Sequence, residues 1–534
     1  MAVAAVARKK AEKESTGLTV TAEELALKQR EISVSEFFVK NRHLLGFDNP
    51  SRALLTAVKE AVDNSLDACE EAGVPPDIEV KIKMLSEDRF TISIEDNGPG
   101  IVRAQIPNIF GKLLYGSKFH TLKMSRGQQG IGISAAGLYG QLTTGKPIVV
   151  TSKTAPQKPA HYYEIVIDTN KNQPIIAKEE EIAWEKKHGT KVEIELEARY
   201  VKGGKSVDDY IRQTVIANPH VRIHYEPPSG ENITYERSSK TLPTQPKAIK
   251  PHPYGVELGN LMKILHSSKS RQLKACLQGE FSRVSPRIAK EICAKAGVPD
   301  NSSPRRIAQQ EAENLYKAIN ATKIMAPPTD CLSPIGEAHI LVGLKNMVKA
   351  DFYTSVTRSP AIYRGNPFQI EIGMAYGVEG YAAEDLITLN RYANRVPLLY
   401  QPGACAITKA VIGTDWRNYG LSQSKSSLPV APMLLMVHMA SVWVPFTSEA
   451  KEAIAHYNEI VKEIKLALQE CGRRMNSFVR KREKAEYELK RRSLFEMYIE
   501  ELSIALNDIT ACGKEKVKKH LLAIAREKTK SGEI

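Results

Sequence analysis

The sequence predicts a multidomain α+β protein with a two-layer α/β sandwich, a helical domain, a second α/β domain and a long helix. Three observations support this prediction. Strand-like and helical stretches are mixed in two regions without the regular alternation of βαβ units, which argues against a Rossmann sheet. Proline-rich segments at 243–253 and 326–330 separate the regions. From 447 to 492 the apolar residues recur on one side of a single helical pattern.

The sequence patterns predict where each part of the chain begins and ends. We expect an N-terminal arm or strap over 1–34, the sandwich over 35–242, a linker and helical domain over 243–325, the second α/β domain over 326–446, a stalk helix over 447–492 and C-terminal helices over 493–534. In the sandwich, the expected strands are 78–84, 90–94, 148–152, 162–168 and 191–196, with a helix over 207–217. In the second α/β domain, the expected strands are 352–358, 368–374, 405–411 and 434–441, with a helix over 382–396.

The composition limits the kinds of partner. The formal net charge is +14, and basic side chains gather in the helical domain and towards the end of the stalk helix. Such clusters favour a polyanionic partner, although a solvated charged surface explains them as well. The seven cysteines are scattered without CxxC spacing, and no apolar run is long enough to cross a membrane. We therefore expect a cytoplasmic protein with reduced thiols.

The first candidate site lies on a helical stretch around residue 60. Glu60, Asn64 and Asp67 are spaced so that they share one face of a helix, while apolar residues occupy the other faces. Carboxylate and amide oxygens suit Mg²⁺, and a glutamate one turn away can orient or deprotonate a water molecule. The same spacing also fits the solvated face of an ordinary amphipathic helix, so this motif alone leaves both interpretations open.

Two further motifs follow it in the sequence. Asp96 ends a strand candidate, where it can accept a hydrogen bond from an exocyclic amine, and Gly98 and Gly100 let the backbone lie against a flat base. The loop 127–132 is rich in glycine and opens a helix, which presents N–H groups to a phosphate. The segment 117–118 precedes this loop and suits a lid. The three motifs in this order predict a nucleotide pocket.

These motifs resemble the N, G1 and G2 boxes of the GHKL ATPases, which include gyrase, the 90-kDa chaperone, sensor histidine kinases and MutL. Residues 37–53, 127–134 and 363–371 resemble the topoisomerase VI B subunits more closely, and this resemblance extends over nearly the whole chain. It implies that Glu60 is the general base, that Asn64 holds Mg²⁺ and that Asp96 binds adenine. It also implies nucleotide contacts by Gly98, Gly100, Ser117, Lys118, Arg126, Gly127, Gln128, Gln129, Gly130, Ile131, Gly132 and Ile133.

The resemblance further implies a lysine that reaches the γ-phosphate from the second α/β domain. Lys425, in a Gln-Ser-Lys sequence, is the candidate for this sensor, since a lysine is a compact charge that can follow a phosphate. Arg417, between Trp416 and Tyr419, is the alternative sensor, and a basic residue between aromatic residues also suits contact with DNA. Both cations fit ordinary surface positions as well.

The helical domain resembles a helix-two-turn-helix module. Its basic residues fit either contact with DNA phosphates or the charged surface of a spacer. By the same family resemblance, the C-terminal helices dock on a separate A subunit.

Taken as a whole, the resemblance implies the ATP-hydrolysing subunit of a type II (IIB) DNA topoisomerase, an isomerase that uses ATP and Mg²⁺. Such a subunit dimerises on ATP binding and clamps one double-stranded DNA segment within an A2B2 heterotetramer. The A subunit cuts the second segment, so that supercoils are relaxed and DNA is decatenated. We expect association with the nucleoid and no membrane contact. The alternative is an ATP-gated clamp or scaffold of the MutL or meiotic-recombination type, without strand passage.

Overall fold

The computed structural model describes residues 22–29, 31–118, 121–127, 130–510 and 513–530. The chain divides into two compact units. The first unit contains the chain up to Ile249 together with the short segment Phe446–Glu452, and the second contains Lys250–Pro445 and the chain from Ala453 onward.

Within the described part of the chain, no helix combines the length and the apolar character needed to cross a membrane.

The first unit is built on a mixed sheet of eight strands. The strands are β1 (Asp77–Ser86), β2 (Arg89–Glu95), β3 (Ile148–Lys153), β4 (Ala160–Asp168), β5 (Gln173–Ile182), β6 (Gly189–Glu197), β7 (Arg222–Glu226) and β8 (Ile233–Tyr235). Their order is β5-β4-β3-β6-β2-β1-β7-β8, and all neighbours are antiparallel except β1 and β7. Buried and half-buried residues alternate along β2, so one face of the strand forms part of the core.

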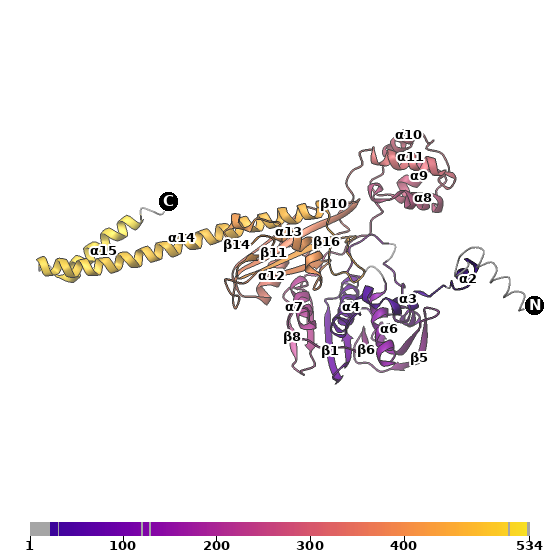
Figure 1. The fold of residues 1–534 in the computed structure, drawn as a ribbon, viewed down its shortest axis with the longest axis horizontal. Helices are drawn as coiled ribbons and strands as arrows, with labels where there is room; N and C mark the ends of the chain where they lie inside the picture. Colours follow the sequence, from indigo (N-terminus) through magenta and orange to yellow (C-terminus); the bar gives the residue numbers. More distant parts are fainter. Residues whose placement is uncertain (1–21, 30, 119–120, 128–129, 511–512, 531–534) are drawn as a thin grey trace, which may run out of the picture. The chain divides into compact units, whose positions relative to one another are not determined.

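Helices form the second layer of this unit. They are α2 (Ala22–Ala26), α3 (Val34–Lys40), α4 (Pro50–Glu71), α5 (Ile106–Gly111), α6 (Gly132–Thr144) and α7 (Val207–Ala217), with 3₁₀ turns η1 (Arg42–Leu45) and η2 (Arg103–Gln105). Helices α4 and α6 pack against β6 and against each other, and α4 also contacts α7. Figure 1 shows α4 and α6 lying along the strands, so the first unit is the two-layer sandwich that the sequence predicts.

The five strands expected in the sandwich are present, and the expected helix over 207–217 coincides with α7. Three further strands, β5, β7 and β8, are not predicted by the sequence patterns. Strand β5 lies at the edge of the sheet, and most of its residues are exposed, so it shows no apolar alternation. Strands β7 and β8 are too short to reveal a clear period.

The second unit begins with a helical region. Its helices are α8 (Leu258–Ser267), α9 (Leu273–Glu280), α10 (Pro286–Ala296) and α11 (Gln309–Asn320), with 3₁₀ turns η3 (Pro253–Gly255) and η4 (Pro304–Arg306). Their apolar faces form a common core, whose members include Leu261, Leu265, Leu277, Ile292 and Leu315. The basic residues lie outside this core, and the following are exposed: Lys263, Lys269, Arg271, Arg283, Arg287, Lys290, Lys295, Arg305 and Arg306.

A six-stranded sheet forms the other core of the second unit. Its strands are β9 (Ala350–Thr357), β10 (Ala361–Tyr363), β11 (Asn366–Val378), β12 (Thr388–Ala393), β13 (Val396–Pro397) and β16 (Met433–Ser441). The order is β10-β11-β16-β12-β13, and β9 also pairs with β11. Around it lie α12 (Glu337–Met347), α13 (Ala406–Ile412), the turns η5 (Pro402–Ala404) and η6 (Trp416–Tyr419), and the short pair β14 (Ser422–Gln423) and β15 (Pro429–Val430).

Two expected elements of this region have the opposite conformation. The stretch 382–396, expected as a helix, contains β12 and β13, because β12 pairs in parallel with β16, in which every residue is buried. The stretch 405–411, expected as a strand, forms helix α13. A short apolar run is compatible with either a strand or a buried helix, and the tertiary environment decides between them. The strands expected over 352–358, 368–374 and 434–441 are confirmed as β9, β11 and β16.

The long helix, α14, runs from Asn458 to Thr510, so both ends expected for the stalk helix are wrong. The helix cannot run on from its expected start at residue 447, because Lys451 has a left-handed backbone with φ of +54°. The first part of α14 buries apolar residues beside β9 and β11, among them Ile460, Ile464, Leu468 and Met475.

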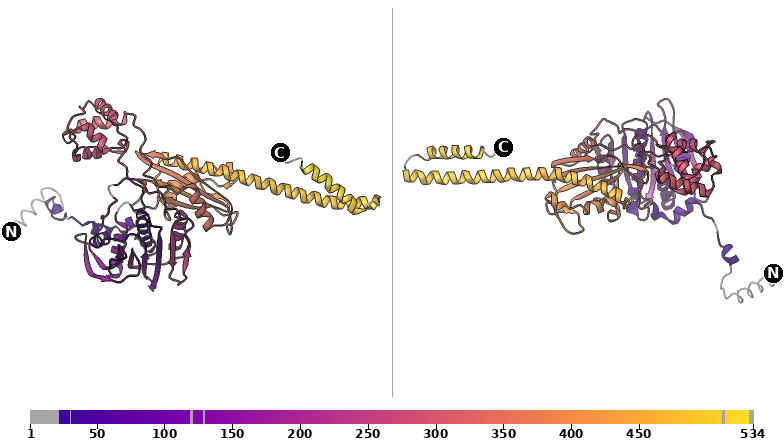
Figure 2. Two further views of the ribbon diagram at one scale, coloured as in Figure 1. Left: turned by 180° about the vertical axis from the view of Figure 1, so that it is seen from behind. Right: turned by 90° about the horizontal axis from the view of Figure 1, so that it is seen from above.

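The far part of α14 is covered only by the last helix, α15 (Lys514–Lys530), among the described residues. This helix turns back along α14, as Figure 2 shows, and Lys514 pairs with Glu500 at 2.7 Å. The boundary expected at residue 493 therefore lies inside one continuous helix, and α15 folds back along it.

A buried carboxylate fixes the centre of the second sheet. Glu371 of β11 accepts hydrogen bonds from His438 Nδ1 at 2.8 Å and from the N–H groups of Ile335 and Gly336, each at 2.7 Å. The proton lies on Nδ1 of His438, because its Nε2 accepts a hydrogen bond from the Arg395 N–H. Burial raises the pKa of Glu371, but these donors outweigh burial and hold the pKa below its ordinary value.

Glu371→Gln should destabilise the second unit by about 1–3 kcal/mol, since the amide NH2 of glutamine cannot accept a hydrogen bond and leaves buried donors without an acceptor. Denaturant unfolding followed by tryptophan fluorescence measures the effect, because Trp416 is fully buried in this unit. The matched control is Glu470→Gln on the solvent-facing side of α14, which should shift the midpoint very little. Equal midpoints for the two variants would contradict the role of Glu371.

Candidate functional site

Helix α4 carries the residues of the first motif. It begins after Asn49, whose side chain accepts a hydrogen bond from the Arg52 N–H at 2.9 Å and so caps the helix. Asn64 is exposed, whereas Asp67 is buried. The apolar residues of the helix lie in the core, among them Leu54, Val58, Val62 and Leu66. Burial of this face leaves the polar face of α4 to form one wall of a site.

Glu60 is held by neighbouring charges on the same helix. Its Oε1 lies 3.2 Å from Lys59 Nζ, and Lys59 Nζ lies 3.3 Å from Asp63. Asp63 accepts a 3.0 Å hydrogen bond from the hydroxyl of Tyr210 on α7. Burial raises the pKa of Glu60, but the positive charges of Lys59 and Lys451 outweigh burial and lower the pKa. Glu60 is therefore ionised at neutral pH, as a general base must be.

The glycine loop meets Glu60 at the start of α6. A Cβ atom at Gly132 would lie 1.8 Å from Glu60 Oε2, so a side chain at this position would displace the Glu60 carboxylate. Gly130 has a φ of +59°, a conformation that favours glycine. Ile131 and Ile133 are buried, so only their backbone groups are left for a ligand. The structure thus brings the third motif against the first, while Gln128 and Gln129 lie outside the described residues.

Asp96 follows β2, and three donors fix its carboxylate. They are Ser65 Oγ of α4 at 3.0 Å, the Gly98 N–H at 2.8 Å and the Thr190 N–H at 3.2 Å. Burial raises the pKa of Asp96, although these hydrogen bonds oppose the shift. A Cβ at Gly100 would lie 2.1 Å from a backbone oxygen, so this close approach requires glycine. A carboxylate that is held in a fixed orientation next to this backbone can accept a hydrogen bond from the exocyclic amine of a base.

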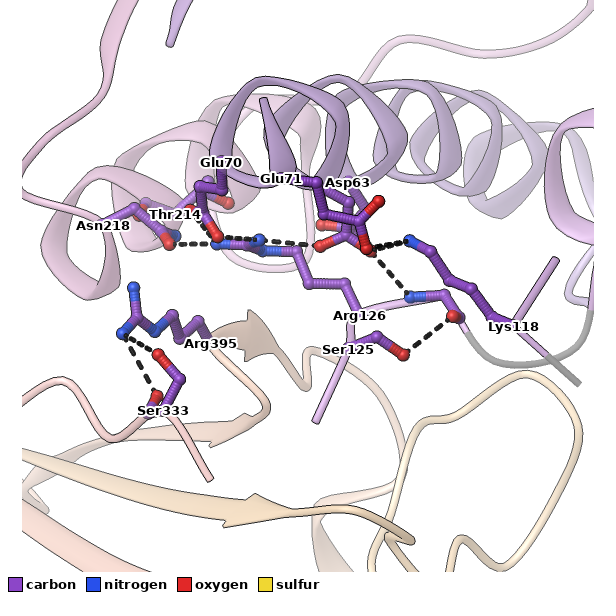
Figure 3. A network of polar contacts seen from close by, with 12 residues as sticks. Asp63, Glu70, Glu71, Lys118, Ser125, Arg126, Thr214, Asn218, Ser333 and Arg395 are labelled. Carbon is purple, nitrogen blue, oxygen red and sulfur yellow. Dashed lines mark hydrogen bonds and ion pairs between the residues drawn. The ribbon is translucent and has the colours of Figure 1, made fainter. Parts of the chain in front are cut away.

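Arg126 lies in a buried network of ion pairs. Its guanidinium donates to Asp67 at 2.8 Å, to both oxygens of Glu70 at 2.7 and 2.8 Å, and to Asn218 Oδ1 at 2.6 Å. Figure 3 shows the guanidinium of Arg126 lying between Glu70 and Asn218, beneath α4. Burial alone lowers the pKa of Arg126, but Glu70 and Asp67 outweigh burial and raise it, so the residue stays charged.

These contacts change the expected roles of two basic residues. Because its donors are bound to Asp67, Glu70 and Asn218, Arg126 does not present an open phosphate contact in this structure. Lys118 lies 2.6 Å from Asp67, so it also connects the lid segment to α4. Its exposed neighbour Ser117 is consistent with either a lid or a surface turn.

The segment Phe446–Glu452 brings to the site a lysine that no sequence motif marks. Lys451 Nζ lies 3.5 Å from the backbone oxygen of Arg126, and its charge contributes to the lowered pKa of Glu60. Sequence analysis misses it because it falls inside the stretch expected to form the start of the long helix. The left-handed backbone of Lys451 is visible only in the structure.

The two sensor candidates from the sequence belong to the second unit. Lys425 is exposed in the turn between β14 and β15. Arg417 is also exposed and pairs with Asp415 at 2.9 Å, while its neighbour Trp416 is fully buried. Neither candidate belongs to the unit that contains Glu60, whereas Lys451 does.

Comparisons with known families agree with this geometry. The profile of the family described as "Histidine kinase-, DNA gyrase B-, and HSP90-like ATPase" matches residues 49–200. The profile described as "Topoisomerase VI B subunit, transducer" matches residues 327–491.

Three relatives are each named as the B subunit of type 2 DNA topoisomerase 6. The one from Methanococcoides burtonii is 51% identical over 459 residues, covering 86% of this chain and 74% of the relative. The one from Archaeoglobus fulgidus is 49% identical over 456 residues, covering 85% and 75%. The one from Natronomonas pharaonis is 34% identical over an alignment of 675 residues, covering 92% and 84%.

The two-layer fold, the pocket residues around Glu60 and the first profile define an ATP-binding ATPase of the histidine kinase, gyrase B and HSP90 class. The transducer profile and the relatives that share half of their residues over most of the chain narrow the class further. The chain belongs to the family of type 2 DNA topoisomerase 6 B subunits.

Lys59→Met should move the acid limb of the pH–rate profile for ATP hydrolysis to higher pH. Removing this cation takes away one of the charges that lower the pKa of Glu60, while Lys451 and the opposing charge of Asp63 remain. A base with a higher pKa loses its ionised form earlier as the pH falls. Steady-state kcat against pH checks this shift. Lys81→Met, which removes a surface lysine paired with Glu79, should leave the profile unchanged, and a shift of equal size there would contradict the assignment.

Proposed function

We propose that the chain is the ATP-hydrolysing subunit of a type IIB DNA topoisomerase, and that it closes as a dimer when ATP binds. The observation that carries this proposal is the close approach of Gly132 to an ionised Glu60. A general base placed at the mouth of a phosphate-binding loop can direct water at the γ-phosphate. Phosphoryl transfer depends mainly on such positioning and on electrostatic stabilisation by the protein.

In this proposal, the other residues of the pocket contact different parts of the nucleotide. Asp96 and Gly98 receive the adenine, and the N–H groups of Gly127, Gly130 and the following residues receive the phosphates. Mg²⁺ would take one protein oxygen from Asn64 and its other ligands from the nucleotide and water. That division fits the donor set, because the described residues contain no group of three or more acidic, histidine or cysteine side chains that could hold a metal.

Lys451 is the better candidate for the lysine that senses the γ-phosphate. It shares a unit with Glu60 and contributes to the lowered pKa of that residue, whereas Lys425 lies in a surface turn of the other unit. Lys451 also adjoins the second unit in sequence, since the chain returns there at Ala453. A change at the γ-phosphate can therefore act on the second unit through the chain itself.

Two surfaces of the second unit fit the macromolecular partners of the proposal. The exposed basic residues of α8–α11 suit DNA phosphates. The far part of α14 exposes a set of large apolar side chains, which suits docking on the A subunit: Tyr487, Leu489, Leu494, Phe495, Met497, Tyr498, Leu502 and Ile509. Cutting of DNA is assigned to that A subunit in an A2B2 assembly.

The purified chain should hydrolyse ATP and should change from monomer to dimer when a non-hydrolysable ATP analogue and Mg²⁺ are added. It should relax supercoiled plasmid only when a purified A subunit is present. Light scattering and agarose-gel relaxation assays measure these properties. Nucleotide-dependent dimerisation without any relaxation in the presence of the A subunit would favour a clamp or scaffold instead, and cleavage of plasmid by this chain alone would contradict the division of labour.

Lys451→Ala should lower kcat for ATP hydrolysis by about 10²-fold, the usual effect of losing one charged contact to a transition state. Binding of a fluorescent ATP analogue should change little. Lys425→Ala is the matched variant, because it removes an exposed lysine of the second unit, and it should retain its hydrolysis rate. The opposite pattern would return the sensor role to Lys425.

A further inference from the structure

The segment Phe446–Glu452 is the part of the chain after Ile249 that joins the first unit. It has neither helical nor strand conformation over most of its length, so no ladder of backbone hydrogen bonds holds it in place. Its position therefore depends strongly on side-chain contacts. Two of these contacts are made by its last two residues, Lys451 and Glu452.

Glu452 forms a buried ion pair with Arg52, which lies in the first turn of α4. The two side chains are only 7% and 13% exposed. Oε1 of Glu452 contacts the guanidinium, whereas Oε2 is buried without a hydrogen-bond partner among the described residues. A buried carboxylate with so few donors depends strongly on the cation with which it is paired.

Arg52 is well placed to act as a fixed anchor. It is in the same helix as Glu60, two turns earlier, and its guanidinium also pairs with Asp48 at 2.5 Å. Because α4 is rigid and buried along its apolar face, the distance along the helix from Arg52 to Glu60 is constant. A residue adjacent to Glu452 is thereby held at a defined place beside the catalytic carboxylate.

The backbone of Lys451 shows that this placement is imposed. Its φ of +54° is a left-handed conformation that is strained for a residue with a side chain. Such a conformation persists only where the surrounding contacts determine it. The ion pair of the adjacent Glu452 is one such contact.

From these observations we propose that the Arg52–Glu452 ion pair is a latch that positions Lys451 at the nucleotide site. This inference deepens the function proposed above and rests on it. Arg52 and Glu452 are positioning residues that act through Lys451. Breaking the pair should slow hydrolysis without removing any group that contacts the nucleotide.

The test measures kcat and nucleotide affinity separately in the full-length chain. Glu452→Gln and Arg52→Gln should each lower kcat by about 10- to 10²-fold, the size of effect expected when a catalytic group is misplaced by about 1 Å. The Kd of a fluorescent ATP analogue should stay close to that of the unmodified chain. Arg52→Lys, which keeps the charge, should retain most of the activity.

A double-mutant cycle supplies the readout that a purely structural role would not give. In a Lys451→Ala background, Glu452→Gln should produce little further loss, because the residue it positions is already gone. Full additivity of the two losses would overturn the latch, as would unchanged kcat in Glu452→Gln and Arg52→Gln. If Glu452→Gln fails to fold, the comparison of Arg52→Lys with Arg52→Gln decides the question.

Two controls separate this inference from the function on which it rests. Glu195→Gln removes the carboxylate of an ion pair with Arg89 on the sheet of the same unit and should leave kcat unchanged. Lys451→Ala alone reports on the sensor. A normal rate in Lys451→Ala would overturn the sensor assignment itself, whereas a slow Lys451→Ala with a normal Glu452→Gln would overturn only the latch.

Discussion

The buried guanidinium of Arg126 ties the nucleotide loop to the rest of the ATPase unit. A charge removed from water is tolerated only where opposite charges and hydrogen-bond acceptors surround it, and breaking such a set typically costs several kcal/mol. Asp67 and Glu70 of α4 and Asn218 after α7 supply that environment. Because Arg126 directly precedes the glycine loop, its burial fixes where that loop begins, and Gly132 then comes to lie against Glu60.

Helix α4 positions every part of the site. Its residues include Glu60, which is proposed as the general base, Asn64, Asp67 and Ser65, which donates a hydrogen bond to Asp96 at the end of β2. Burial of the apolar face sets the rotation of the helix, so these groups keep fixed positions relative to one another. The charged residues of the helix also affect one another. Lys59 forms an ion pair with Asp63 and lowers the pKa of Glu60.

The second unit is organised by different interactions. Its central strand, β16, is buried along its entire length, and the buried pair of Glu371 and His438 joins it to β11. The expected helix over 382–396 and the expected strand over 405–411 are both wrong here, because local sequence patterns do not show how a segment pairs within the core. In a core where strand and helix are equally buried, apolar composition no longer distinguishes them.

The sequence by itself determined the three motifs of the proposed nucleotide pocket and their order. The spacing of Glu60, Asn64 and Asp67, the turn after Asp96 and the glycines of 127–132 are local patterns, and each predicts chemistry that depends on a few neighbouring residues. Only the tertiary structure decided which charged side chains lie next to these motifs. The burial of Arg126 by acids from α4, the contact of Lys451 with the backbone oxygen of Arg126 and the pairing of Glu452 with Arg52 join residues far apart in the chain. Such contacts leave no periodic pattern, because they depend on how whole elements pack and not on the spacing of residues within one of them.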